Sequence, residues 1–188
     1  MPVCAVCDTP ARVIYWRYYL HGEETALTNG TKARSTLRRL CLAGIIAALY
    51  AALTLAFSPI SFGAVQFRIS EALTLLPVLF PEAIPGLALG CLVSNLLGGV
   101  MPWDPIFGTL ATLLAAALSW RLRKSALLAA LPPVVCNAVI VGGMLHFILP
   151  DCALLPTMLT VGAGEAVVCY GLGVPLLMGL KRAHLPRL

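Results

Sequence analysis

The stretch Leu40-Cys41-Leu42-Ala43-Gly44-Ile45-Ile46-Ala47-Ala48-Leu49-Tyr50-Ala51-Ala52 begins a run without a charged residue that continues through Phe67. A helix needs about 20 predominantly apolar residues to cross the hydrocarbon core of a bilayer. The run is long enough, and Ser58-Pro59 marks the end of its helical part. We therefore expect a membrane-spanning helix over residues 39–57.

Composition extends this interpretation to the whole chain. Of its 188 residues, 60% are hydrophobic and 11% are charged, whereas soluble domains carry about 25% charged residues. The apolar runs are continuous, which favours helices over the alternating strands of a membrane barrel. We expect an all-α membrane protein with six transmembrane helices. Their expected ranges are 39–57, 69–80, 84–100, 105–120, 125–149 and 157–180.

The first 37 residues differ from the rest of the chain. They carry several charges and contain neither a spanning run nor the parts of a signal peptide. We expect residues 1–37 to be a poorly ordered cytoplasmic extension, residues 38–182 to be the membrane domain and residues 183–188 to be a cytoplasmic tail. A misassigned start codon, with the natural protein beginning near Leu27, is the alternative for the extension.

Basic residues predict the orientation of the six spans. They precede the first span, join the fourth to the fifth and follow the sixth, and in a six-span chain these places share one side of the membrane. By the positive-inside rule this side is the cytoplasm, with both termini inside a bacterial plasma membrane. Arg68 is then the only basic residue after Arg39 on the outer side. The residues of the cytoplasmic groups are Arg38, Arg39, Arg121, Arg123, Lys124, Lys181, Arg182 and Arg187.

Polar side chains from several spans gather in the predicted outer half of the membrane. A charge at bilayer depth costs about 2.5 kcal/mol or more and usually faces a protein interior. Glu165 follows Gly162-Ala163-Gly164, and these small residues leave room for a ligand. The pattern indicates an outward-facing pocket whose carboxylates suit a cationic ligand or one with several N–H donors. The residues are Arg68, Glu71, Asn95, Asp104 and Glu165, with Asn137 nearer the middle of the membrane.

Several of these residues also have a purely structural interpretation. Arg68 and Glu71 would share one face of a helix and form an interfacial ion pair. Asn95 and Asn137 would join neighbouring helices, at about 0.6 kcal/mol on average. Trp103 would belong to an interfacial aromatic belt, whereas its place in an outer loop also favours stacking on a flat ligand.

Small residues form two rows along the first span. Ala43, Ala47 and Ala51 are spaced by four, and Gly44, Ala48 and Ala52 form a second row beside them. Small residues at this spacing allow close approach of another helix. The partner of this face is either another helix of the same chain or a separate protein.

The seven cysteines indicate no metal site. Most of them lie in or beside apolar runs, where a free cysteine packs as a small hydrophobe. Cys4 and Cys7 have the spacing of a zinc knuckle, but no second pair follows. We expect neither a metal nor a cofactor.

The chain contains no phosphate-binding loop of the kind an ATPase requires. A transporter built on it must use an ion gradient or borrow an ATPase, and no inverted repeat supports ion-coupled transport. An intramembrane enzyme is a weaker alternative, because no metalloprotease or serine hydrolase motif is present. A scaffold protein would not need Glu165 in a membrane span.

Several ordered blocks resemble the QueT family of queuosine-precursor transporters. The resemblance covers about residues 35–182 and rests on agreement of the blocks in order. The first blocks are Gln66-Phe67-Arg68-Ile69-Ser70-Glu71-Ala72-Leu73 with Leu76-Pro77, Ile84-Pro85-Gly86 through Gly90-Cys91, and Ser94-Asn95-Leu96-Leu97-Gly98-Gly99. The later ones are Asp104 with Phe107-Gly108-Thr109-Leu110-Ala111-Thr112-Leu113, and Gly164-Glu165-Ala166-Val167.

The resemblance implies the substrate-binding S-component of an energy-coupling-factor (ECF) importer, with six helices and an outward ligand site. The implied ligand is a 7-deazaguanine such as preQ1, preQ0 or queuine. The implied partners are a transmembrane coupling subunit and two cytoplasmic ATPases, with docking at Ala43, Ala47 and Ala51. An S-component for another vitamin-like molecule is the alternative of the same architecture.

The chemistry of a 7-deazaguanine indicates roles for the polar residues. Its N1–H and exocyclic amine form a donor pair that a carboxylate accepts, and Glu165 is our first choice for this contact. The cationic aminomethyl group of preQ1 would contact Glu71 or Asp104. The remaining expected contacts are stacking on Trp103 or Phe67, and a hydrogen bond between Asn95 or Gln66 and the carbonyl.

Overall fold

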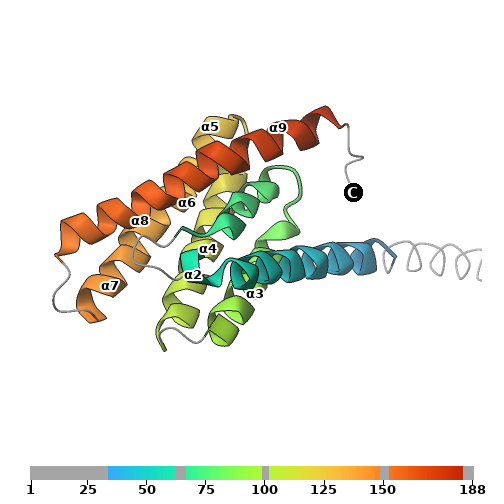
Figure 1. Cartoon of the computed structure of the whole chain (residues 1–188). Helices are drawn as coiled ribbons and strands as arrows, with labels where there is room; N and C mark the ends of the chain where they lie inside the picture. The colour runs from blue at the N-terminus through green and yellow to red at the C-terminus, as the bar shows by residue number, and fades with distance from the viewer. Residues whose placement is uncertain (1–33, 62–66, 99–101, 149–152, 184–188) are drawn as a thin grey trace, which may run out of the picture. The chain divides into compact units, whose positions relative to one another are not determined.

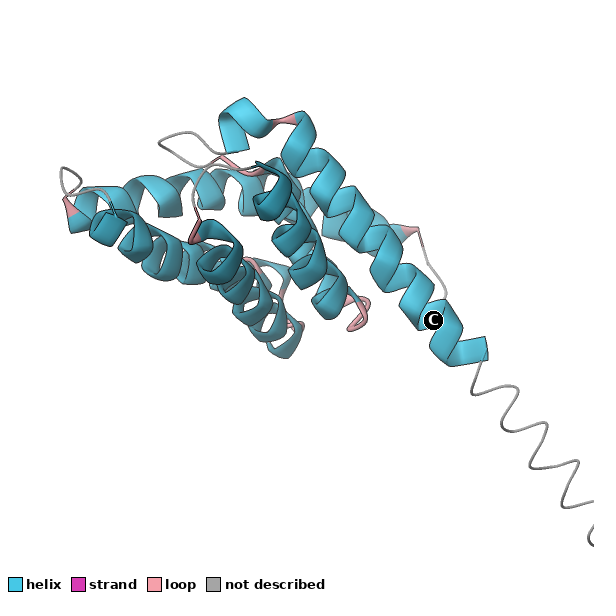
Figure 2. Ribbon diagram, turned by 90° about the horizontal axis from the view of Figure 1, so that it is seen from below, coloured by secondary structure: helices cyan, strands magenta, loops and turns pink. Residues whose placement is uncertain are grey.

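The computed structural model describes residues 34–61, 67–98, 102–148 and 153–183, and these ranges contain helices and short connections but no strand (Figure 2). The chain divides into two compact units, Met1–Arg39 and Leu40–Leu188. Residues 34–39 are the described part of the first unit, and they are helical. The predictions for residues 1–33, for the Cys4 and Cys7 pair and for Gln66 lie outside the described residues.

Helices follow one another along the second unit in the order that the apolar runs predict (Figure 1). The all-α class is thereby confirmed for the described ranges. The first helix spans Arg34–Ala56, of which Leu40–Ala56 belongs to this unit. The elements that follow are α2 (Ser58–Ser61), the 3-10 helix η1 (Ile69–Val78), α3 (Ala83–Gly98), α4 (Asp104–Arg121), α5 (Ala126–Ala129), α6 (Leu131–Cys136), the π-helix η2 (Asn137–Val141), α7 (Gly142–Ile148), α8 (Leu154–Val168), the π-helix η3 (Cys169–Gly173) and α9 (Val174–Arg182).

Three of the described helices are long and apolar enough to cross a membrane: Arg34–Ala56, Ala126–Ile148 and Leu154–Arg182. The last of these joins α8, η3 and α9 into one long helix (Figure 1). η1 and α3 are apolar but shorter. The finding supports a membrane protein, while six complete crossings stay a prediction.

The second predicted span differs most from expectation. It is a 3-10 helix of 10 residues, which at about 2.0 Å rise per residue is about 20 Å long, against about 30 Å for the hydrocarbon core. Pro77 lies inside it, and every residue from Ser70 to Pro77 is buried. η1 is therefore a short core element surrounded by protein, and the short span expected over 69–80 stays a prediction.

The first helix packs on α3 with its backbone in close contact. A Cβ atom added to Gly86 would lie 2.5 Å from the carbonyl oxygen of Ala43, and one added to Gly90 would lie 2.7 Å from that of Ala47. α3 packs in turn on α4, which also contacts η1, α6 and η2. α4 thus lies between the N-terminal and C-terminal helices of the unit.

This packing bears on the predicted docking face of the first helix. Ala43 is buried, and the close approach of Gly86 and Gly90 covers the backbone of its row. The neighbouring row, Gly44, Ala48 and Ala52, is exposed, and nothing lies within 4 Å of a Cβ atom added to Gly44. The row Ala43, Ala47 and Ala51 therefore packs at least in part on α3, the internal alternative for this face, and docking there stays a prediction.

We predict that Gly86→Ala lowers the thermal unfolding temperature of the purified protein, because the new methyl group meets backbone that cannot move aside. Overpacking of this kind costs about 1–3 kcal/mol. Gly44→Ala is the matched control: it adds the same methyl group in open space and gains helix propensity of up to about 1 kcal/mol. Equal shifts for the two variants would contradict the close packing of these helices.

Candidate functional site

Buried polar side chains from five elements meet around η1. They come from the first helix, η1 and the residue before it, α3, α4 and α8. Buried polar groups are costly unless they are hydrogen-bonded, and buried charges more so. The cluster comprises Tyr50, Thr54, Arg68, Ser70, Glu71, Asn95, Asp104, Thr112 and Glu165, none of which exposes more than 3% of its surface.

Glu71 lies at the centre of this cluster and is fully buried. The hydroxyl of Tyr50 donates a hydrogen bond to its Oε1 at 2.5 Å, and the hydroxyl of Thr112 approaches the same oxygen at 3.3 Å. The other oxygen, Oε2, is buried and has no hydrogen-bond partner among the described residues. One side of the carboxylate is therefore fixed, and the other is an unused acceptor.

Asn95 places a second unused acceptor in the cluster. Its amide nitrogen donates to the backbone oxygen of Asp104 at 3.0 Å and lies 3.4 Å from the sulfur of Cys91. Its Oδ1 is buried and makes no hydrogen bond within the described part of the chain. Gly108 makes room for this arrangement, since a Cβ atom there would lie 2.7 Å from the Asn95 amide nitrogen.

Arg68 lies immediately before η1, and its Nε donates to the backbone oxygen of Ser61 at 3.4 Å. Its guanidinium comes within 3.5 Å of the position of a Cβ atom on Gly108, beside the Asn95 amide. It also interacts electrostatically with Glu71 and Asp104. Arg68 thus belongs to the cluster.

Glu165 joins the cluster from α8. It is 2% exposed, and the thiol of Cys169 lies 3.9 Å from its Oε2, which is a weak contact. The same thiol lies 3.8 Å from the backbone oxygen of Glu71, and the Glu165 and Glu71 carboxyl groups interact electrostatically. The helix that carries Cys169, η3, also packs closely on η1. A Cβ atom added to Gly173 in η3 would lie 3.1 Å from the backbone oxygen of Ala72 in η1.

Asn137 is the first residue of the π-helix η2 and is 2% exposed. Its Nδ2 donor is buried and has no hydrogen-bond partner in the ranges that the structure describes. η2 packs on both α4 and α8. Short π-helical segments occur frequently at functional sites, so the unused amide is a candidate contact for a ligand.

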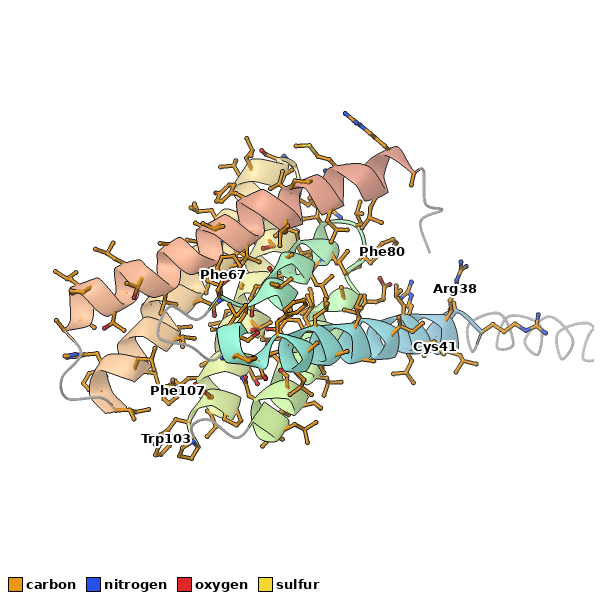
Figure 3. All side chains as sticks on the ribbon, viewed as in Figure 1. Arg38, Cys41, Phe67, Phe80, Trp103 and Phe107 are labelled. Atoms are coloured by element: carbon orange, nitrogen blue, oxygen red, sulfur yellow. The ribbon has the colours of Figure 1, made fainter. Side chains whose placement is uncertain are left out.

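Trp103 is placed differently from the polar residues. Its ring is half exposed and tilted against Phe107 at the start of α4, with 6.4 Å between the ring centroids (Figure 3). Both rings line an apolar groove of about 640 Å³ that also involves α7 and carries no charged side chain. Phe67, in contrast, is half-buried and directly precedes Arg68. Each of the two rings predicted to stack on a ligand directly precedes a cluster residue in the chain, and only Trp103 lines the apolar groove.

Sequence reasoning missed Tyr50 and Thr112, which hold Glu71, and the cysteines that flank the carboxyl groups. Tyr50 is the one strongly polar side chain in the stretch Leu40–Ala52. A lone hydroxyl in an apolar helix could have indicated that Tyr50 has a buried hydrogen-bond partner. Within the described ranges, no group of three or more His, Cys, Asp or Glu residues is placed to hold a metal ion. The cluster offers unused acceptors on Glu71 and Asn95, and Asn137 on η2 offers an unused donor, which suits a small polar ligand better than an ion.

Comparisons with known proteins agree with the membrane architecture. Residues 40–182 match the family model described as QueT transporter. The chain is 40% identical over 77 residues to a protein named queuosine precursor transporter QueT from Lactococcus lactis subsp. cremoris (strain MG1363). This match covers 39% of the chain and 44% of the relative, so the chain spans less than half of that protein's length. No solved structure matches the chain.

We predict that Gly108→Ala lowers the unfolding temperature, because its methyl group would displace the Asn95 amide from the Asp104 carbonyl and crowd the Arg68 guanidinium. Loss of a buried hydrogen bond costs about 1–3 kcal/mol. Gly143→Ala in α7 is the control, since nothing lies within 4 Å of a Cβ atom there. A Gly108→Ala protein as stable as the control would show that the Asn95 side chain is not held as described.

Proposed function

This chain belongs to the QueT transporter family, and from that premise we propose that it is the substrate-binding S-component of an ECF-type ABC importer for a queuosine precursor. The observation that carries the proposal is the buried cluster around Glu71, which has unused acceptors on η1 and α3. Asn137 on η2, which packs on α4 and α8, adds an unused donor. Buried polar atoms nearly always have a hydrogen-bond partner in native proteins, and a ligand would supply one here. Membership of a transporter family also implies that the chain is not an enzyme.

The proposed topology has six membrane crossings with both termini in the cytoplasm. It is supported by the basic residues that flank the long helices, such as Arg121 in the last turn of α4 and Arg182 in that of α9. With this orientation, Arg68, Asn95 and Asp104 lie toward the outer face of a bacterial plasma membrane. The ligand would then enter the cluster from outside the cell.

A 7-deazaguanine matches the unused atoms of the cluster in type. Its N–H donors would face carboxylate and amide oxygens, with Glu165 accepting the N1–H and the exocyclic amine. Asn137 would donate its free N–H to the ring carbonyl, a contact that the sequence assigned to Asn95 or Gln66. Asn95 would instead accept from the ligand through Oδ1. Phe67 would stack on the flat ring.

The proposed partners are a transmembrane coupling subunit and two ATPases, because the chain has no nucleotide-binding loop of its own. We place their docking on the exposed row Gly44, Ala48 and Ala52 of the first helix, in place of the row that packs on α3. Its small residues would let a partner helix come close. Exposed Ile45 and Leu49 on the same helix extend the apolar surface.

We predict that preQ1, preQ0 or queuine binds the purified protein in isothermal titration calorimetry, and that Glu165→Gln weakens this binding by about tenfold or more. The reason is that an amide accepts only one of the two donor bonds, and a factor of ten is about 1.4 kcal/mol. Glu82→Gln, at a half-buried carboxylate outside the cluster, is the control. Absence of heat with all three ligands would refute the ligand assignment, and unchanged affinity would remove Glu165 from the site.

We predict that Ala48→Trp abolishes uptake of the labelled precursor in cells that contain the ECF module, yet leaves binding to the purified protein intact. A large ring on the exposed row blocks a partner helix without entering the core. Leu159→Trp, at a 71% exposed position on α8, is the control that keeps uptake. Normal uptake with Ala48→Trp would place the docking face elsewhere.

A further inference from the structure

Two buried side chains of the first helix hold it to η1. Tyr50 is fully buried, and its hydroxyl donates to Glu71 Oε1 at 2.5 Å. One turn further on, the hydroxyl of Thr54 forms a 2.7 Å hydrogen bond with that of Ser70. These two bonds fix the register of the first helix against η1 at the level of Glu71.

The bond from Tyr50 also determines how the Glu71 carboxylate is turned. Oε1 lies near two hydroxyl groups, those of Tyr50 and Thr112, while Oε2 is buried without a hydrogen bond inside the described ranges. A carboxylate is planar, so fixing one oxygen fixes the direction of the other. Oε2 is thus a positioned acceptor for which the described residues supply no donor.

The charges around this acceptor indicate what the bound molecule carries. Among the described residues, Glu71, Asp104 and Glu165 are the buried carboxyl groups, and Arg68 is the one buried arginine or lysine. Arg68 interacts electrostatically with Glu71 and Asp104, and it also acts on Glu165. If all three carboxyl groups are ionised, one guanidinium leaves the cluster with a net negative charge, and burying an unbalanced charge is costly. A ligand with a cationic group would reduce this imbalance.

We propose that Tyr50 is a positioning residue that turns Glu71 so that Oε2 receives an ammonium group of the ligand, and that the site thereby selects precursors with an amine over those with a nitrile. The inference rests on the proposed function, and it adds a residue and a specificity that the ligand class alone does not contain. Thr112 assists from α4 by approaching the same oxygen as Tyr50. Tyr50 itself does not touch the ligand.

The test compares two ligands that differ at one substituent: preQ1, with an aminomethyl group, and preQ0, with a nitrile. Both are titrated calorimetrically into the full-length wild-type chain and into Tyr50→Phe, which keeps the ring and removes the hydroxyl. We expect the wild type to prefer preQ1. In Tyr50→Phe the affinity for preQ1 should fall by about tenfold or more, as for loss of a hydrogen bond to a charged group, with a much smaller change for preQ0.

Tyr170→Phe is the matched control. Its hydroxyl donates to the backbone oxygen of Leu127 at 3.2 Å, away from the cluster, so the same chemical change should leave the ratio of the two affinities unaltered. A second pair of variants, at Thr112, tests the same role if Tyr50→Phe does not fold. Thr112→Val should lower the preference for preQ1, and Thr112→Ser, which keeps a hydroxyl, should retain it.

The outcomes separate this inference from the function on which it rests. If neither ligand binds the wild type, the proposed function fails and the inference fails with it. If both bind and the wild type shows no preference for preQ1, the specificity is refuted while the function stands. If Tyr50→Phe, or Thr112→Val in its place, weakens both ligands equally or neither, the residues are structural and the positioning role is refuted.

Discussion

The burial of the Glu71 carboxylate is the constraint on which the rest of this helical unit depends. A carboxylate removed from water is costly unless its oxygens are bonded or its charge is balanced. The elements around η1 each contribute to this: the first helix brings Tyr50, α4 brings Thr112, and η3 brings the thiol of Cys169 to the Glu71 carbonyl. Because neighbouring helices satisfy these groups, η1 can remain short and lie wholly inside protein.

Glycine allows these elements to come close enough to act on Glu71. Because Gly90 has no side chain, the first helix packs closely on α3, which brings Tyr50 into the cluster. A Cβ atom added to Gly90 would lie 2.8 Å from the Cβ atom of Tyr50. Gly108 leaves space for the Asn95 amide and the Arg68 guanidinium. Gly173 brings η3 against η1. The apolar packing and the polar cluster are therefore one arrangement, since a methyl group at any of these positions would disturb both.

The membrane character and much of the cluster could be predicted from the sequence, because the length of an apolar run and the cost of a buried charge are local properties. The 3-10 form of η1 could not, since it depends on neighbours that bury the segment on every side. The hydrogen bond from Tyr50 to Glu71 could not be predicted either, because it joins residues that are 21 positions apart in the sequence. Spacing alone also could not decide which small-residue row of the first helix faces inward, because this depends on where Gly86 and Gly90 lie in α3.

The first helix combines two properties on different faces, and their combination has a physical consequence. Its inner face bonds to η1 through Tyr50 and Thr54, while the row with Gly44 and Ala48 is exposed. A helix moves as a stiff body over a few turns, and a hydrogen bond weakens steeply as its geometry departs from the optimum. On the proposed function, a partner that displaced this helix would also release Oε1 of Glu71. Docking on one face and loss of ligand contacts behind the other would then be coupled through the hydrogen bond from Tyr50 to Glu71.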